Sequence, residues 1–143
     1  MESLGMKKIC ALLIVLLFAS GCSQNNVFSL KVGQCFDDSV IGVEVSNVGL
    51  VDCDEPHLNE IYAVAELPDG DFPLVFIAED SSELCYNAFE SFVGQAYEYS
   101  IYEIGFLHPS KEAWDEVDDR EVVCYLYDMT GQMKTGTAAN SGL

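Results

Sequence analysis

Four ionisable side chains lie close together between positions 54 and 60 of the chain. They are the carboxylic acids Asp54, Glu55 and Glu60 and the imidazole of His57. A histidine beside carboxylates can act as a general acid or base, or can bind a divalent cation through nitrogen and oxygen atoms. Any chemistry of this protein is therefore sought first around His57.

The spacing of these residues does not match the common patterns for catalysis or metal binding. The sequence contains neither the serine hydrolase pattern G-x-S-x-G nor an EF-hand loop, and no second histidine follows His57 at H-x-x-E-H spacing. A pair of glycosidase acids could be drawn almost anywhere, because the chain has 24 Asp and Glu residues. We therefore expect no catalytic residues, no metal and no cofactor. We expect the ring of His57 to bond to Glu60 or to a backbone carbonyl and so to stabilise a turn.

Residues 1–21 have the pattern of an export signal. Lys7 and Lys8 precede an apolar stretch that is too short to span a bilayer, and small residues at 19–21 precede Cys22. The segment resembles a bacterial lipoprotein signal, and the resemblance implies cleavage before Cys22 and attachment of a lipid to its thiol. Ala19 stands where leucine is usual, so ordinary secretion with a different cleavage site stays open.

The charge of the chain limits its partners. Six basic residues face 24 acidic ones, which gives a formal net charge of -18. Such a charge excludes a nucleic-acid backbone as a partner and opposes binding to anionic lipid surfaces. We therefore expect residues 22–27 to form a short lipidated tether, which alone holds the domain at the extracytoplasmic face of the cell membrane.

Four cysteines remain after the leader, namely Cys35, Cys53, Cys85 and Cys124. An even number in an exported chain indicates disulfides, and the lack of a C-x-x-C spacing argues against a zinc or redox motif. Three pairings are possible. The local one, Cys35 with Cys53 and Cys85 with Cys124, costs least to close, and on the chain-entropy model these bonds contribute about 3 and about 4 kcal/mol.

The hydrophobic pattern predicts an α+β domain over residues 28–137, a small antiparallel sheet crossed by one main helix. Strands are expected at 31–36, 43–46, 58–67, 99–107 and 121–128, with extended chain at 48–53 and a last short strand at 132–137. In the strand 58–67, alternation places Ile61, Ala63, Ala65 and Leu67 on one buried face.

From residue 74 onward the apolar period changes from two to 3.6, which predicts the helix. It should begin between Leu74 and Ser81, with Asp80 and Glu83 in its first turn, and end before Gly94. Ser110 can cap a short helical segment that carries Trp114 inward. Residues 138–143 are interpreted as a flexible tail.

A series of motifs, from about residue 31 to about residue 136, resembles the septum formation domain family of bacterial envelope proteins. The motifs are Val32–Asp37, Cys53–His57 with Glu60, Cys85, His108–Ser110 with Trp114, and Asp119–Cys124. The resemblance implies a link with septation and the cell envelope. The family supplies no agreed reaction, so it implies no catalytic residues.

These observations predict a lipid-anchored, non-catalytic binding domain of the bacterial envelope, with a link to cell division. The expected partner is an unidentified envelope protein or wall component. The contact surface is expected at an exposed turn formed by Asp54, Glu55, Pro56 and His57, together with Glu60. Two alternatives stay open: a hydrolase of wall polymers that uses His57 and nearby carboxylates as acid and base, and a weak binder of divalent cations through the acidic loops.

The lipid anchor gives the first testable prediction. A Cys22→Ala variant should leave the membrane and appear in the medium or the periplasm, because no other thiol is placed at the cleavage site to receive the lipid. Fractionation followed by a salt wash checks this. A variant that still sediments with the membranes would contradict the lipoprotein interpretation.

Overall fold

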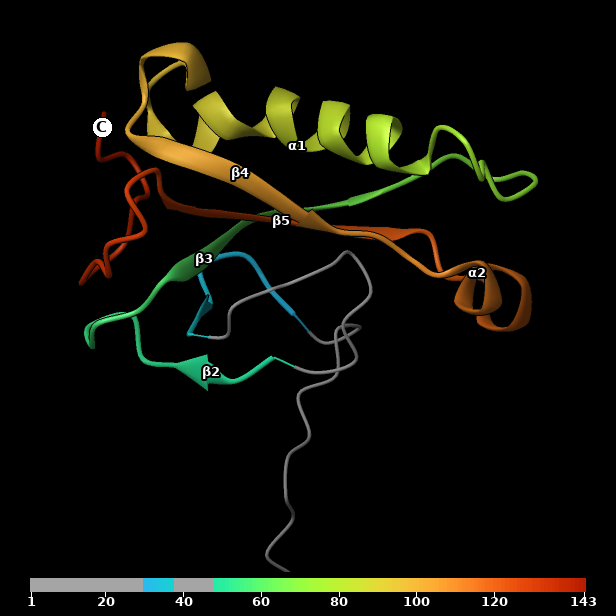
Figure 1. The fold of residues 1–143 in the computed structure, drawn as a ribbon, viewed down its shortest axis with the longest axis horizontal. Helices are drawn as coiled ribbons and strands as arrows, with labels where there is room; N and C mark the ends of the chain where they lie inside the picture. Colours follow the sequence, from blue (N-terminus) through green and yellow to red (C-terminus); the bar gives the residue numbers. More distant parts are fainter. Residues whose placement is uncertain (1–29, 38–47) are drawn as a thin grey trace, which may run out of the picture.

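The computed structural model describes residues 30–37 and 48–143, in which one antiparallel sheet carries two helices. The strands are β1 (Cys35–Phe36), β2 (Leu50–Val51), β3 (Asn59–Glu66), β4 (Tyr102–Leu107) and β5 (Glu121–Asp128), and the helices are α1 (Ile77–Val93) and α2 (Lys111–Val117). The strand order is β2-β1-β3-β5-β4, and neighbouring strands are antiparallel throughout. Figure 1 shows α1 lying along one face of the sheet and α2 at one end of it. The α+β class predicted from the hydrophobic pattern is confirmed.

Helix α1 is fixed to the sheet at Cys85. The side chains of Cys85, Phe89 and Val93 are buried against the sheet, as the 3.6-residue period predicts. Cys85 forms a disulfide with Cys124 on β5, and the hydroxyl of Tyr62 on β3 donates a hydrogen bond of 2.8 Å to the Cys85 carbonyl. The helix ends where predicted, because Gly94 takes a left-handed conformation (φ 80°) that favours glycine.

A β-bulge in β3 changes the predicted orientation of its side chains. Ile61 pairs with Tyr125 and Ala63 pairs with Cys124, so Tyr62 is an extra residue between two consecutive partners. The extra residue places Tyr62 and Ala63 on the side of α1, whereas Ile61 packs on the opposite face of the sheet. The prediction that Ile61 and Ala63 share one face is therefore wrong, because strict alternation fails at a bulge.

The face of the sheet opposite α1 has a second apolar cluster. It is formed by Leu30, Phe36, Val48, Ile61, Leu107, Val123 and Tyr125. The central strands β3 and β5 are thus covered on both faces. Tyr125 packs edge to face against Phe36 and lies directly across from Gly105, where the absence of a side chain leaves room for its ring.

Helix α2 follows the capping prediction. The hydroxyl of Ser110 accepts a hydrogen bond from the Ala113 backbone at 3.1 Å, and Trp114 is buried. The indole nitrogen of Trp114 donates to the carbonyl of Gly70 at 2.9 Å. This bond ties α2 to the loop that precedes α1.

The C-terminal segment differs from its prediction. The expected strand at 132–137 is replaced by a single bridge between His57 and Lys134. Residues 138–143 are bound to the domain instead of forming a flexible tail: Ala138 is buried, Asn140 donates to the Phe92 carbonyl at 2.7 Å, and Gly142 donates to the Val93 carbonyl at 2.9 Å. These bonds satisfy carbonyls that the end of α1 leaves unpaired.

Three predictions fall outside the described residues. They are the signal segment 1–21, the tether 22–27 and the strand at 43–46. Within residues 30–37 and 48–143, no helix is both long enough and apolar enough to cross a bilayer.

The contact between Gly105 and Tyr125 gives the second prediction. A Cβ atom at position 105 would lie 2.2 Å from Cζ of the Tyr125 ring, and Phe36 holds that ring in place. Gly105→Ala should therefore lower the free energy of unfolding by about 1–3 kcal/mol, which urea unfolding measures. The loss should shrink in a Tyr125→Leu background, whereas an equal loss in both backgrounds would contradict this explanation.

Candidate functional site

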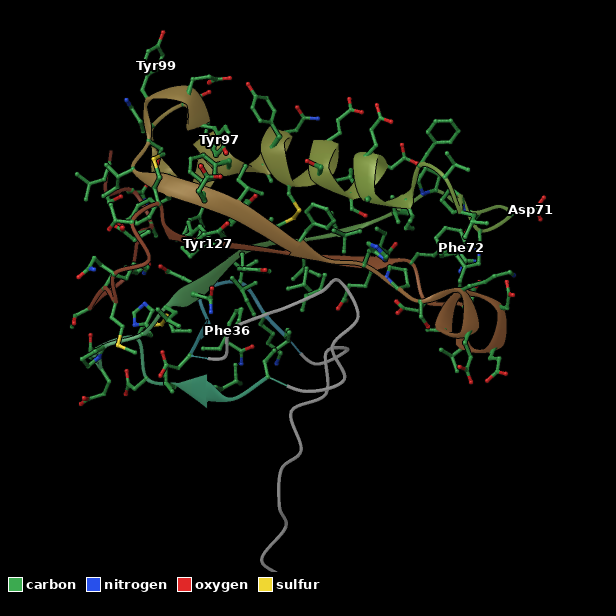
Figure 2. All side chains as sticks on the ribbon, in the orientation of Figure 1. Phe36, Asp71, Phe72, Tyr97, Tyr99 and Tyr127 are labelled. Carbon is green, nitrogen blue, oxygen red and sulfur yellow. A yellow bond between two sulfur atoms is a disulfide. The ribbon has the colours of Figure 1, made fainter. Side chains whose placement is uncertain are left out.

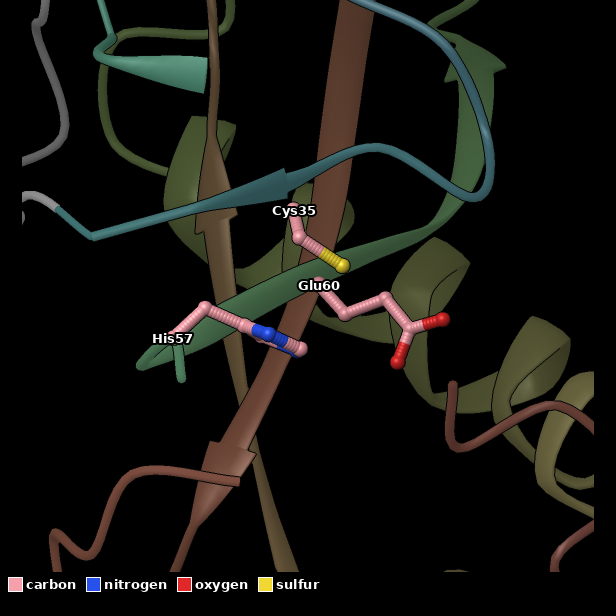
Figure 3. A group of neighbouring side chains, drawn as sticks. All are labelled: Cys35, His57 and Glu60. Carbon is pink, nitrogen blue, oxygen red and sulfur yellow. The ribbon is translucent and has the colours of Figure 1, made fainter. Parts of the chain in front are cut away.

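Three side chains from β1 and from the start of β3 lie close together where these two strands pair. They are Cys35 on β1, His57 just before β3, and Glu60 on β3 (Figure 3). One ligand atom of each lies within 4.8 Å of the other two. Cys35 is 1% exposed, and His57 and Glu60 are 0% exposed. The sequence placed His57 and Glu60 together but gave no reason to add Cys35.

Backbone pairing and a disulfide bring this cluster together. Cys35 pairs with Glu60 across the β1–β3 ladder, which puts the two residues side by side. The predicted Cys35–Cys53 disulfide is present, with a Cα–Cα distance of 5.3 Å, and it draws the turn after Cys53 toward the sheet. The backbones of His57 and Lys134 then exchange two hydrogen bonds of 2.9 Å each. His57 is therefore enclosed by the turn and the C-terminal segment.

The ring of His57 bonds to a backbone carbonyl, one of the two partners expected from the sequence. Nδ1 lies 2.8 Å from the carbonyl oxygen of Glu55. A carbonyl only accepts hydrogen bonds, so Nδ1 carries the proton. Nε2 is buried and has no hydrogen-bond partner in the part of the chain that the structure describes. The expectation that His57 is exposed is wrong, because the disulfide and the Lys134 backbone close over it.

Glu60 is the most fully bonded member of the cluster. One of its oxygens, Oε2, accepts from Nζ of Lys134 at 2.5 Å and from the backbone N–H of Ala138 at 2.8 Å. The other oxygen, Oε1, accepts from the hydroxyl of Thr137. The side chain of Lys134 is 12% exposed, so this ion pair is largely removed from water. Glu60 therefore binds the C-terminal segment to β3.

Sequence analysis missed the partner of Glu60. Lys134 is the last of only six basic residues in the chain, and the one before it is Arg120. A buried carboxylate requires a cation, and the chain offers few of them. This small number of candidates is the one signal that could have identified Lys134.

The cluster has the ligand types of a zinc site, but two of its three residues already use their donor atoms in other bonds. Zinc binds thiolate sulfur, imidazole nitrogen and carboxylate oxygen. The Cys35 sulfur is bonded to Cys53, and both oxygens of Glu60 already accept hydrogen bonds. In its disulfide form, the cluster therefore acts as a structural joint between β1, β3 and the C-terminal segment.

The remaining residues of the predicted contact surface lie apart from this cluster. Asp54, Glu55 and Pro56 are exposed, whereas His57 and Glu60 are buried. The backbone N–H of Asp54 donates to the Asp52 carboxylate at 3.0 Å, and Glu55 donates to the Asp52 carbonyl at 3.0 Å, so the turn is well formed. Of the five predicted contact residues, only these three are thus exposed to a partner.

The architecture is that of a small α+β domain with two disulfides and a buried ion pair. The family model described as "Septum formation" matches residues 32–141 of the 143-residue chain. The chain therefore belongs to the septum formation family, as the motif series predicted, and this membership suggests an envelope role related to cell division. Comparisons with curated proteins and with solved structures found no significant match.

The buried ion pair gives the third prediction. Glu60→Gln removes the negative charge that Lys134 faces and leaves a cation inside the domain. The free energy of unfolding should fall by about 3 kcal/mol, and the melting temperature by at least about 10 °C. Glu55→Gln, at an exposed carboxylate nearby, should change stability by less than about 0.5 kcal/mol. Equal melting temperatures for the two variants would show that the pair does not hold the fold.

Proposed function

We propose that the mature protein is a lipid-anchored, extracytoplasmic binding domain of the bacterial envelope that acts in a process linked to septation and catalyses no reaction. Family membership supports the process. The lipoprotein-like leader and the net charge of -18 support attachment through a lipid and not through contact with the bilayer surface.

The proposal that the domain catalyses no reaction is supported by the burial of His57 and Glu60 and by their bonds within the domain. A general acid or base must reach a substrate proton directly or through one water molecule. Both side chains are 0% exposed, and Glu60 bonds to three groups of the C-terminal segment. His57 and Glu60, which the sequence suggested as candidates for acid–base chemistry, thus form bonds within the fold instead.

The short tether limits where the partner is found. Six residues, 22–27, span at most roughly 20 Å when fully extended. The domain is therefore held close to the outer surface of the membrane. Its partner is then an envelope component that is itself attached to the membrane or lies next to it.

Turnover assays with the purified mature domain give the fourth prediction. Fragments of wall polymer should remain intact, both with the wild type and with His57→Gln, because the ring has no access to a substrate. Chromatography of the fragments measures this. Cleavage by the wild type that His57→Gln abolishes would establish the hydrolase alternative instead. In parallel, the tethered domain should retain an envelope component from solubilised membranes.

A further inference from the structure

Three large apolar side chains in succession are exposed just before α1. Leu74 is 73% exposed, Val75 is 80% exposed and Phe76 is 58% exposed. We call these three residues the apolar ridge. Asp71 and Phe72, which precede it, lie at the end of the molecule near α2, and Tyr99 lies at the opposite end (Figure 2). A run of exposed apolar side chains of this kind is typical of a surface that binds a partner.

Backbone hydrogen bonds hold the apolar ridge in one conformation. The N–H groups of Phe76 and Ile77 both donate to the carbonyl of Pro73, at 2.9 and 2.7 Å. Leu74 donates to the Phe72 carbonyl at 2.8 Å, and Ile77 is buried and begins α1. The ridge is therefore already ordered, so a partner would lose little free energy in fixing it.

An open depression of 520 Å³ adjoins the apolar ridge. Leu74, Phe72 and Trp114 contribute apolar surface to its lining. The Trp114 ring is held by its bond to Gly70, by the edge of Phe72 at a centroid distance of 5.6 Å, and by the Arg120 guanidinium 3.7 Å from the ring centroid. These contacts fix the position of the aromatic side chains that line the depression.

The surroundings of the depression are strongly acidic. It shares Asp118 and Arg120 with a second depression beside it. Together they are lined by two basic residues, Lys111 and Arg120, and by seven acidic ones: Glu66, Asp69, Asp71, Asp115, Asp118, Asp119 and Glu121.

Internal ion pairs use both of these cations. Lys111 pairs with Asp115, and Arg120 pairs with Asp118 at 2.7 Å. Burial, followed by the neighbouring carboxylates of Asp119 and Glu66, raises the pKa of Glu121, which agrees with an excess of negative charge here. An approaching cation would lower this repulsion.

We propose that the apolar ridge and the adjoining depression form the docking surface for a basic polypeptide segment that carries apolar side chains. This inference rests on the proposed binding function and names the partner class. The apolar side chains of the segment contact Leu74, Val75 and Phe76 or enter the depression, and its Lys or Arg side chains face the acidic rim. An anionic bilayer is the poorer occupant, because the same carboxylates repel its headgroups.

The single tryptophan of the chain, Trp114, reports on this surface by its fluorescence. The probe is a short tryptophan-free peptide of lysine and leucine, titrated into the full mature domain, and the control peptide has glutamate in place of lysine. The lysine peptide should bind, change the Trp114 emission and weaken as salt is raised, whereas the glutamate peptide should not bind.

Matched variants locate the surface. Replacing Leu74, Val75 and Phe76 together by serine should weaken binding by about tenfold or more, whereas Tyr99→Ser, at an equally exposed site on the opposite end, should leave it unchanged. Asp71→Asn with Asp115→Asn should also weaken binding more than Asp54→Asn with Glu55→Gln. Melting curves confirm that the variants are folded.

Several results would overturn the inference. Binding that survives the serine replacements, or that is lost only with the Asp54 and Glu55 variant, places the contact elsewhere and leaves the binding function intact. Phosphatidylglycerol vesicles that change Trp114 emission where the peptide does not would identify a membrane contact instead. The proposed function itself fails separately, if the tethered domain retains no envelope component and the purified domain cleaves wall polymer.

Discussion

The carboxylate of Glu60 has to be neutralised inside the domain, and much of the structure follows from this requirement. A buried charge without a partner costs several kcal/mol, so β3 can hold Glu60 only if a cation reaches it. Lys134 supplies that cation and brings Thr137 and Ala138 with it, which both donate to the same carboxylate. The C-terminal segment then crosses the end of β3 and continues to the end of α1, where it bonds to carbonyls that the helix leaves open.

The Cys35–Cys53 disulfide and this ion pair lie at one end of the domain, and the exposed apolar side chains before α1 lie at the other. The Cys35–Cys53 bond, the His57–Lys134 bridge and Glu60 all lie near β1 and the C-terminal segment. The loop before α1 and helix α2 lie at the other end, where apolar side chains are exposed and acidic residues gather. The sequence drew attention to the first end because His57 stands there beside several carboxylates. The structure shows that His57 is enclosed, so the proposed binding function depends on other surfaces.

The elements that rest on local patterns could be predicted from the sequence, and those that rest on distant contacts could not. Helix α1, strand β5, the Ser110 cap and both disulfides follow from periodicity, capping chemistry and loop length. The bulge at Tyr62 has no sequence signature, because it depends on how many residues of β5 stand opposite β3. The attachment of residues 138–143 depends on backbone groups bonding to Glu60 and to the end of α1, which leaves no periodic pattern in a short polar segment.

A double-mutant cycle on Glu60 and Lys134 tests the central claim most directly, namely that this pair joins the C-terminal segment to the sheet. Urea unfolding of Glu60→Gln, Lys134→Met and the double variant gives the coupling free energy between the two side chains. We predict a coupling free energy of at least about 1.5 kcal/mol. The double variant should therefore lose less stability than the sum of the two single losses. Additive losses, or single variants as stable as the wild type, would contradict the claim that this pair joins the C-terminal segment to the sheet.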